Sequence, residues 1–280
     1  MAVQFDKPTV EQLPPGTLEQ GTGEPIVLLH GVLGRSGMWN EVLPLLASSQ
    51  RAIALPALGH LGGRRCQLRP ARIEHVVDDV ERSLDALRLD RAHLAGNSLG
   101  GWVALELSRR GRARTVSAFS PAGLWSAADH VGGRGRLRAI VRLTRATRGL
   151  LPLTARLGAV RKFALRDNAV HGDRLTPSAV VALADAVLNC EVAEDLLATS
   201  EQFAPLEVTC PTLIVWSERD RIFPLDPFAR TARERIPGAR HSVLQGVGHV
   251  PMFDDPELVA STILQQLARV HEPLVHEARV

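Results

Sequence analysis

The sequence predicts an α/β fold in which a mostly parallel central sheet is flanked by helices. Short continuous apolar runs, such as residues 26–30 and 211–216, are typical of strands that are buried on both faces. Segments with helical periodicity separate these runs; in residues 73–87, apolar side chains recur every three or four positions. Because strands that alternate with helices indicate βαβ units, we expect a parallel sheet.

The elements can be assigned in chain order. Residues 1–24 carry weak strand signals broken by prolines and glycines, and we expect a short antiparallel hairpin there, at the sheet edge. The later strands are expected at the apolar runs 26–30, 51–55, 92–95, 115–119, 211–216 and 240–244. Helices are expected where apolar residues follow helical spacing, at 38–46, 73–87, 102–110, 136–148, 177–188, 226–236 and 256–270. The polar tail, residues 271–280, is expected to fray.

Composition and motif content argue against several classes of protein. No uninterrupted apolar run approaches the length of about 18 residues that a membrane span needs, and the N-terminus shows no signal-peptide pattern. The cysteines Cys66, Cys190 and Cys210 are scattered, which favours reduced thiols in a cytoplasmic protein. Neither a phosphate-binding glycine motif nor metal-ligand spacing occurs, so we expect no cofactor and no metal.

Charge is distributed unevenly along the chain. The net charge is +3, but residues 124–174 hold 11 basic and three acidic residues, whereas the remainder holds 22 basic and 27 acidic. One hypothesis is that this segment attracts anionic substrates or an anionic surface; the alternative is a solvated helix face whose charges serve solubility. Because few aromatic residues lie between the basic ones, no nucleic-acid partner is expected.

Residues 92–101, AHLAGNSLGG, carry the most informative motif. An apolar strand pattern leads into Gly96-Asn97-Ser98-Leu99-Gly100, and a helix pattern follows, which is the context that a G-x-S-x-G turn requires. A serine at the tip of such a turn brings its flanking residues close to neighbouring backbone, so a Cβ at Gly96 or Gly100 would collide. The helix that follows directs free N–H groups toward the serine, which favours a developing negative charge.

With this motif the chain resembles the α/β-hydrolase family over nearly its whole length. The resemblance implies a core domain of residues 1–123 and 204–280. It also implies that residues 124–203 form a helical cap, inserted after the strand at 115–119, over the active site. In this fold the catalytic residues follow the chain order Ser, Asp or Glu, then His, and Ser98 is the candidate nucleophile.

The acid and the base each have one leading candidate. Asp220 lies in the loop after a buried strand and four residues before Pro224, as in the family pattern; Glu218 is the competing carboxylate. His249 lies in Gly248-His249-Val250-Pro251, which resembles the family's segment after the last strand. His30, beside Gly31, is expected to stabilise a turn instead. By resemblance, the backbone N–H groups of Leu99 and Val32 form the oxyanion hole.

The resemblance favours an enzyme that hydrolyses a small to medium, partly apolar carboxylic ester through an acyl-enzyme on Ser98. Family members with an Asp nucleophile, such as epoxide hydrolases, are disfavoured because residue 98 is serine and the chain contains no tyrosine. Hydroxynitrile lyases are disfavoured because neither Lys7 nor Lys162 is well placed. The turn at residues 96–101, which we call the elbow, also resembles that of meta-cleavage-product hydrolases, which cut C–C bonds. However, Val250 stands where those enzymes usually carry Trp.

A non-hydrolytic enzyme and a ligand-binding receptor of this fold are further alternatives. The expected partner is a small-molecule substrate, and a homo-oligomeric state is left open. The candidate residues of the pocket wall are large apolar side chains near the predicted site or in the cap: Met38, Trp39, Leu124, Trp125, Phe163, Phe203, Ile222, Phe223 and Val250.

Overall fold

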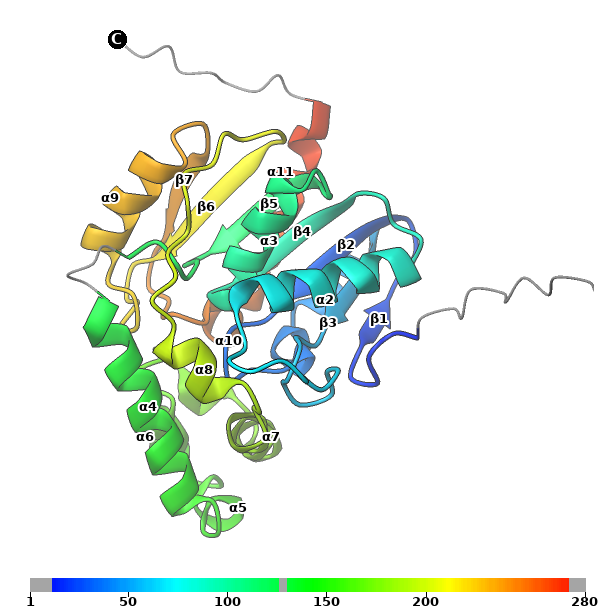
Figure 1. Ribbon diagram of the computed structural model, residues 1–280. Helices are drawn as coiled ribbons and strands as arrows, with labels where there is room; N and C mark the ends of the chain where they lie inside the picture. Colours follow the sequence, from blue (N-terminus) through cyan, green and yellow to red (C-terminus); the bar gives the residue numbers. More distant parts are fainter. Residues whose placement is uncertain (1–11, 126–129, 272–280) are drawn as a thin grey trace, which may run out of the picture.

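The computed structural model describes residues 12–125 and 130–271, and its centre is one seven-stranded sheet (Figure 1). The strand order is β1-β3-β2-β4-β5-β6-β7, and every neighbouring pair is parallel except β1 and β3. The α/β class with a mostly parallel sheet is therefore confirmed. The strands are β1 (Leu18–Gln20), β2 (Glu24–Leu29), β3 (Gln50–Leu55), β4 (Ala92–Asn97), β5 (Ala113–Phe119), β6 (Thr212–Ser217) and β7 (Arg240–Leu244).

Of the hairpin expected in residues 1–24, residues 1–11 lie outside the described part of the chain, and residues 12–23 contribute one strand, β1. Strand β1 does lie at the sheet edge and is antiparallel, but its partner is β3, with Leu18 opposite Ala54. The next strand in the chain, β2, pairs with β3 and β4 instead. The sequence predicted a strand at the sheet edge. Its pairing partner, however, lies more than 30 residues further along the chain.

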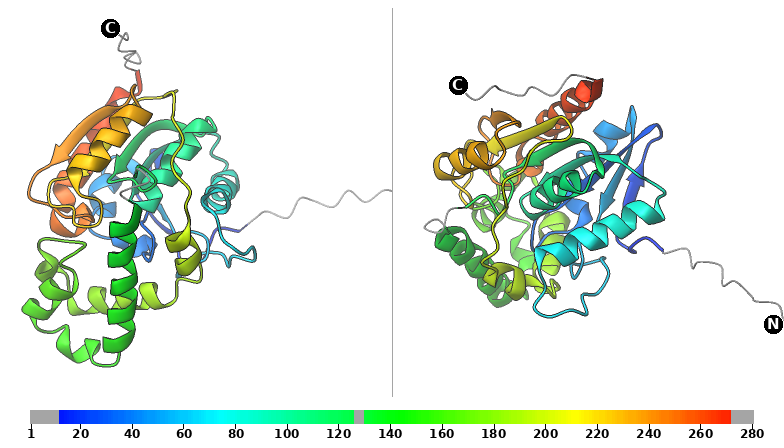
Figure 2. Two further views of the ribbon diagram at one scale, coloured as in Figure 1. Left: turned by 60° about the vertical axis from the view of Figure 1, so that its left-hand side comes forward. Right: turned by 45° about the horizontal axis from the view of Figure 1, so that its top comes forward.

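Helices cover both faces of the sheet, as the right-hand view of Figure 2 shows. Alternate strand residues face opposite layers: Val27 packs with the helices of one face, and Ile26 with those of the other. The first layer contains α2 (Ile73–Ala86), α3 (Leu99–Arg109) and α9 (Leu225–Arg235); the second contains α1 (Leu43–Ala47) and α11 (Pro256–Leu267). Because helices cover both faces, consecutive residues of a strand are all buried, which explains why the strands appear in the sequence as continuous apolar runs.

The helix expected at residues 38–46 is split into a 3-10 helix, Ser36–Trp39, and α1. Pro44 lies in the first turn of α1, where its missing N–H costs no hydrogen bond. Proline therefore favours a new helix start at this point and not the continuation of one from Met38.

Between β5 and β6 the described chain contains helices and no strand. These helices, which we call the insertion, are α4 (His130–Thr147), α5 (Leu151–Thr154), α6 (Gly158–Ala164), α7 (Pro177–Leu188) and α8 (Ala193–Ala198). They lie together beside the sheet layers (Figure 1). They also have a small apolar core of their own, formed by Leu151, Ala155, Leu165, Val180 and Ala184.

Two further sequence expectations can be compared with the described residues. None of the helices within 12–125 and 130–271 combines the length and the apolar character needed to cross a bilayer. Cys66, Cys190 and Cys210 are free thiols and are buried. Burial raises the pKa of Cys190 to about 11 and also raises the pKa of Cys210, so both remain protonated at neutral pH. Of the polar tail, residues 272–280 lie outside the described residues.

Candidate active site

Ser98 stands on a strained turn between β4 and α3. Its φ of 56° and ψ of −116° lie outside the regions that a non-glycine residue readily adopts, a conformation that typically costs about 1–3 kcal/mol. A Cβ at Gly96 would lie 2.1 Å from the carbonyl oxygen of Gly100, and one at Gly100 would lie 2.2 Å from that of Leu29. The close packing predicted for the two glycines is therefore present, and it holds Ser98 at the end of β4.

His249 and Asp220 meet although they come from different loops. Asp220 follows β6, His249 follows β7, and the distance from His249 Nδ1 to Asp220 Oδ2 is 2.7 Å. The other carboxylate oxygen, Oδ1, accepts hydrogen bonds from the backbone N–H groups of Ile222, at 2.8 Å, and Phe223, at 2.7 Å. Because an ionised carboxylate can only accept, Nδ1 carries the proton, and Nε2 of the neutral ring is left as an acceptor.

Glu218, the competing carboxylate, does not reach the ring. Its Oε2 accepts a hydrogen bond from the backbone N–H of Gly246 at 2.9 Å and lies 3.5 Å from Nε of Arg219. Its side chain is 40% exposed, whereas that of Asp220 is fully buried. The geometry thus pairs His249 with Asp220.

Backbone contacts hold the His249 loop on three sides. Nδ2 of Asn97, the residue before Ser98, donates to the carbonyl oxygen of His249 at 2.8 Å. The N–H of Val250 donates to the carbonyl oxygen of Asn168 in the insertion at 2.8 Å. The N–H of Gly248 donates to Oδ2 of Asp254 at 2.7 Å. The position of the imidazole therefore depends on both the elbow of Ser98 and the insertion.

Asp254 is a residue of this region that the sequence analysis missed. Besides Gly248, its carboxylate accepts hydrogen bonds from the N–H groups of Val170, at 3.0 Å, and His171, at 2.6 Å, and the residue is buried. Arg174 Nη1 donates to its carbonyl oxygen at 2.9 Å. The only signal was an acidic residue close before α11, which reads as a helix cap; the neighbouring Asp255 makes that cap.

Ser98 and His249 both line a cavity of about 260 Å³. Among the described residues, their side chains make no direct hydrogen bond to each other. Hydrogen bonds of this kind are often long before a substrate is bound. The cavity walls are mainly apolar side chains of the insertion, among them Leu137, Ile140 and Leu143 on α4 and Val180, Leu183 and Val187 on α7.

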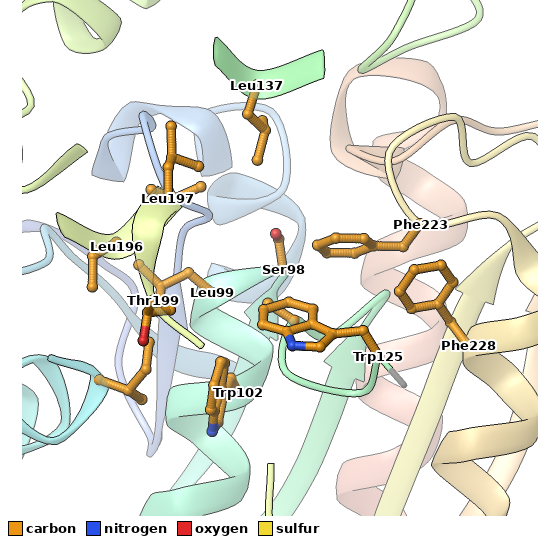
Figure 3. Close-up of a pocket in the computed structure, with 13 residues that line it drawn as sticks. Ser98, Leu99, Trp102, Trp125, Leu137, Leu196, Leu197, Thr199, Phe223 and Phe228 are labelled. Carbon is orange, nitrogen blue, oxygen red and sulfur yellow. The ribbon is translucent and has the colours of Figure 1, made fainter. Parts of the chain in front are cut away.

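A second cavity, of about 40 Å³, lies on another side of Ser98. Figure 3 shows the Ser98 hydroxyl between Phe223 and Trp125 on one side and Leu196 and Leu197 on the other. Val32, Ser98 and Leu137 line both cavities, whereas His249 lines only the larger one. The serine therefore lies where a small and a large apolar space meet.

Two backbone N–H groups beside Ser98 are available to a substrate. Within the part of the chain that the structure describes, the N–H groups of Val32 and Leu99 make no hydrogen bond. Both residues line the smaller cavity together with Ser98. Leu99 begins α3, so the positive end of the helix dipole lies at the same place.

The predicted pocket residues fall into two groups. Met38 and Val250 line the larger cavity, and Trp125 and Phe223 line the smaller one. The other five line neither, so their assignment to the pocket wall needs correction. Trp39, Leu124, Phe203 and Ile222 are buried and pack in the apolar cores of the sheet layers. Phe163 is 61% exposed on α6, and Arg166 lies over its ring.

His30 has a structural role, as its position beside Gly31 suggested. Its Nε2 accepts a hydrogen bond from the N–H of Ala57 at 3.0 Å, and its Nδ1 lies 2.8 Å from the carbonyl oxygen of Gly31. The ring of His60 lies against it, with the centroids 5.1 Å apart. Burial, followed by the neighbouring His60, lowers the pKa of His30 to about 3; burial also lowers the pKa of His60 to about 4.

Comparison with known proteins identifies the family to which this architecture is similar. The model described as "Alpha/beta hydrolase family" matches residues 26–262. An epoxide hydrolase of Mycobacterium tuberculosis is 35% identical over 67% of this chain and 93% of its own length. A 2-hydroxy-6-oxo-6-(2'-aminophenyl)hexa-2,4-dienoic acid hydrolase of Metapseudomonas resinovorans is 27% identical over 90% of this chain and 87% of its own length.

Solved structures show the same fold. A thermophilic esterase from Thermogutta terrifontis superposes with a TM-score of 0.69 over 91% of this chain and 93% of its own. The sequences are 23% identical, so this likeness concerns the arrangement of the backbone alone.

Proposed function

The chain belongs to the alpha/beta hydrolase family, and from this premise we propose that it is a serine hydrolase of small to medium, partly apolar carboxylic esters. The insertion serves as the cap over the active site, because its helices supply most of the wall of the larger cavity. One observation carries the proposal: the Asp220–His249 pair is buried beside the cavity into which Ser98 projects.

In the proposed reaction, Nε2 of His249 takes the proton of the Ser98 hydroxyl while Oγ attacks the ester carbonyl carbon. Asp220 keeps the ring in the tautomer with the proton on Nδ1 and stabilises the positive charge that forms on it. The carbonyl oxygen becomes an oxyanion, which accepts hydrogen bonds from the free amides of Val32 and Leu99.

Collapse of the tetrahedral intermediate breaks the bond between the carbonyl carbon and the alcohol oxygen. His249 returns its proton to that oxygen, the alcohol leaves, and the acyl group remains on Ser98. A water molecule, deprotonated by His249, then attacks the acyl carbon. The bond from that carbon to Oγ of Ser98 breaks, His249 returns the proton to Oγ, and the carboxylic acid and free Ser98 are released. No other group is needed for either step.

The two cavities support a proposal for where each half of the ester lies. The leaving alcohol must lie within reach of His249, and His249 lines only the larger cavity. We therefore place the alcohol there and the acyl group in the smaller cavity, beside the oxyanion amides. The preferred substrates have a short acyl group and a longer, apolar alcohol.

Two reactions named by the relatives are the competing functions. Epoxide opening by an aspartate nucleophile does not fit this chain, because residue 98 is serine and no tyrosine is present to polarise the epoxide. Hydrolysis of a C–C bond is favoured by the dienoic acid hydrolase relative and by the resemblance of residues 96–101 to the turn of meta-cleavage-product hydrolases. Against it, Val250 stands where those enzymes usually have Trp.

The test is a substrate panel on the wild type and on Ser98→Ala. We expect hydrolysis of p-nitrophenyl acetate and butyrate, slower hydrolysis of the octanoate, and no hydrolysis of styrene oxide or a ring-fission dienone. Ser98→Ala should lose nearly all esterase activity, by analogy with a loss of about 10⁶ in a serine protease. A serine-directed phosphonate should add its mass to the wild type and not to the variant.

Three outcomes contradict the proposal. Faster turnover of the dienone than of every ester assigns C–C hydrolysis. Turnover of the epoxide that Ser98→Ala retains assigns another nucleophile. Ligand binding that Ser98→Ala leaves intact, with no turnover by the wild type, assigns a receptor.

A further inference from the structure

Exposed apolar side chains are concentrated in one part of the insertion. Among the described residues, six large hydrophobic side chains are exposed, and five of them fall between positions 143 and 163. They are Leu143 (41% exposed), Leu150 (66%), Leu153 (66%), Leu157 (62%) and Phe163 (61%), and we call them the distal patch. Such a concentration is unusual, since exposed apolar residues on soluble domains are normally scattered.

The local geometry places three of these leucines on one side of the chain. Backbone hydrogen bonds from residue i+3 or i+4 to residue i run through residues 147–157, so the segment around α5 forms continuous helical turns. Leu150, Leu153 and Leu157 share its outer side. Leu151 and Ala155, on the inner side, are 7% and 0% exposed and pack in the core of the insertion. Figure 1 and the left-hand view of Figure 2 both show α5 at the far end of the insertion.

The charge of this region has one sign. Residues 130–166 contain ten lysines and arginines and no aspartate or glutamate. Arg156 and Lys162 are exposed close to Leu157 and Phe163 in the chain. Arg166 covers the ring of Phe163, with its guanidinium carbon 4.1 Å from the ring centroid. Arg136, Arg138 and Arg148 pair with acidic side chains of other segments. Among the described residues, Arg156 and Lys162 form no ion pair, so the patch combines protruding apolar side chains with exposed positive charge.

The distal patch is continuous with the larger cavity. Leu143, which is 41% exposed, belongs to the patch and also lines that cavity. Thr147 and Arg166 line the cavity beside it. Leu143 therefore joins the distal patch to the cavity that Ser98 also lines.

We propose that the distal patch docks the protein onto an anionic lipid bilayer. Leucine and phenylalanine side chains enter the boundary between headgroups and acyl chains, and flanking basic residues are attracted to anionic headgroups. A second copy of this chain is a poor occupant, because it would bring two positively charged surfaces together. This inference extends beyond the proposed function and does not depend on Ser98.

Vesicle sedimentation tests the proposal on the full chain. We expect the wild type to bind vesicles rich in phosphatidylglycerol far more tightly than phosphatidylcholine vesicles, and less tightly as salt rises. Leu150→Ser with Leu153→Ser should weaken binding more than tenfold. The matched control is Leu68→Ser, which removes an equally exposed leucine elsewhere (58%) and should bind like the wild type.

A charge-reversal pair provides a second, independent variant. Arg156→Glu with Lys162→Glu should weaken binding by about fivefold or more for each position. Arg230→Glu, an exposed arginine on α9, should have little effect. Ser98→Ala should bind vesicles like the wild type, so a failed esterase proposal would leave this result intact. The replaced leucine, arginine and lysine side chains are exposed, so thermal unfolding of these variants, followed by circular dichroism, should be unchanged.

The proposal is overturned if the wild type does not bind anionic vesicles, or binds both vesicle types equally. It is also overturned if the patch variants bind like the wild type. A wild-type dimer in sedimentation velocity that Leu150→Ser with Leu153→Ser dissociates, without vesicle binding, would assign the patch to self-association instead.

Discussion

The side chains of Asp220 and His249 form a buried pair in which Oδ2 of the carboxylate lies 2.7 Å from Nδ1 of the ring. The two residues follow different strands, and the pair exists only because β6 and β7 are neighbours in the sheet. The same carboxylate is fixed by two backbone N–H groups, so it cannot rotate away from the ring without losing them.

Replacement of this carboxylate should abolish most of the activity. Asp220→Asn keeps the shape, but its amide can no longer fix the proton on Nδ1. We expect kcat for p-nitrophenyl butyrate to fall by about 10⁴, the loss seen for the equivalent change in a serine protease. Glu218→Gln, two residues away and 40% exposed, should change kcat by less than about threefold. A larger effect of Glu218→Gln than of Asp220→Asn would contradict the assignment.

The division of the ester between the two cavities predicts opposite effects of two cavity variants. Leu197→Ala enlarges the smaller cavity, so kcat/KM should rise for p-nitrophenyl hexanoate relative to the acetate. Val187→Phe narrows the larger cavity, so kcat/KM should fall about tenfold for octyl acetate and little for ethyl acetate. If Leu197→Ala instead alters selectivity for the alcohol, the two halves of the substrate are placed the other way round.

Asp254 should matter for both stability and turnover. Asp254→Ala leaves the N–H groups of Val170, His171 and Gly248 without their acceptor, and each unsatisfied buried group costs about 1–3 kcal/mol. We expect the free energy of unfolding in urea to fall by roughly 3 kcal/mol or more. Because Gly248 precedes His249, we also expect kcat to fall by about tenfold or more.

Asp255→Ala is the matched control for Asp254→Ala. Its carboxylate caps α11 by accepting a hydrogen bond from the N–H of Leu258 at 2.8 Å, a contact worth about 1 kcal/mol. That variant should lose stability with kcat unchanged. Equal kcat values for the two variants, measured where both are folded, would show that Asp254 does not position His249.

The buried histidines predict acid sensitivity. The pKa of His30 is lowered to about 3 and that of His60 to about 4, against about 6.5 in the unfolded chain. Below pH 6.5 the unfolded chain therefore binds protons that the folded protein excludes. The stabilisation is fully present above pH 6.5 and is lost as the pH falls toward 4.

Each of the two histidines should contribute up to about 1.4 kcal/mol per pH unit to this loss. Burial also lowers the pKa values of His93 and His241, which act in the same direction. Urea unfolding between pH 7 and 5 measures the slope, and His60→Gln should reduce it by about one proton. A free energy of unfolding that stays constant from pH 6.5 to 5 would contradict these pKa values.

Much of the fold could be predicted because it is encoded in short stretches of sequence. Apolar runs predicted the strands after β1, and the helices at α7 and α2 began where their periodicity began. The glycine spacing around Ser98 predicted the close packing that the turn requires. In contrast, α4 starts before its expected first residue, because Gly132, Gly133 and Gly135 weaken the helical signal there.

The sequence by itself determined the strands, the helices and the strained turn at Ser98, because these depend on residues within a few positions of one another. Only the tertiary structure decided that β1 pairs with β3, that Asp220 and not Glu218 meets His249, and that Asp254 ties the insertion to the His249 loop. It also decided that Phe163 faces outward on the distal patch while Trp125 lines a cavity. Such contacts join residues far apart in the chain, and the choice among equally apolar or equally acidic candidates depends on which surfaces the folded layers bring together.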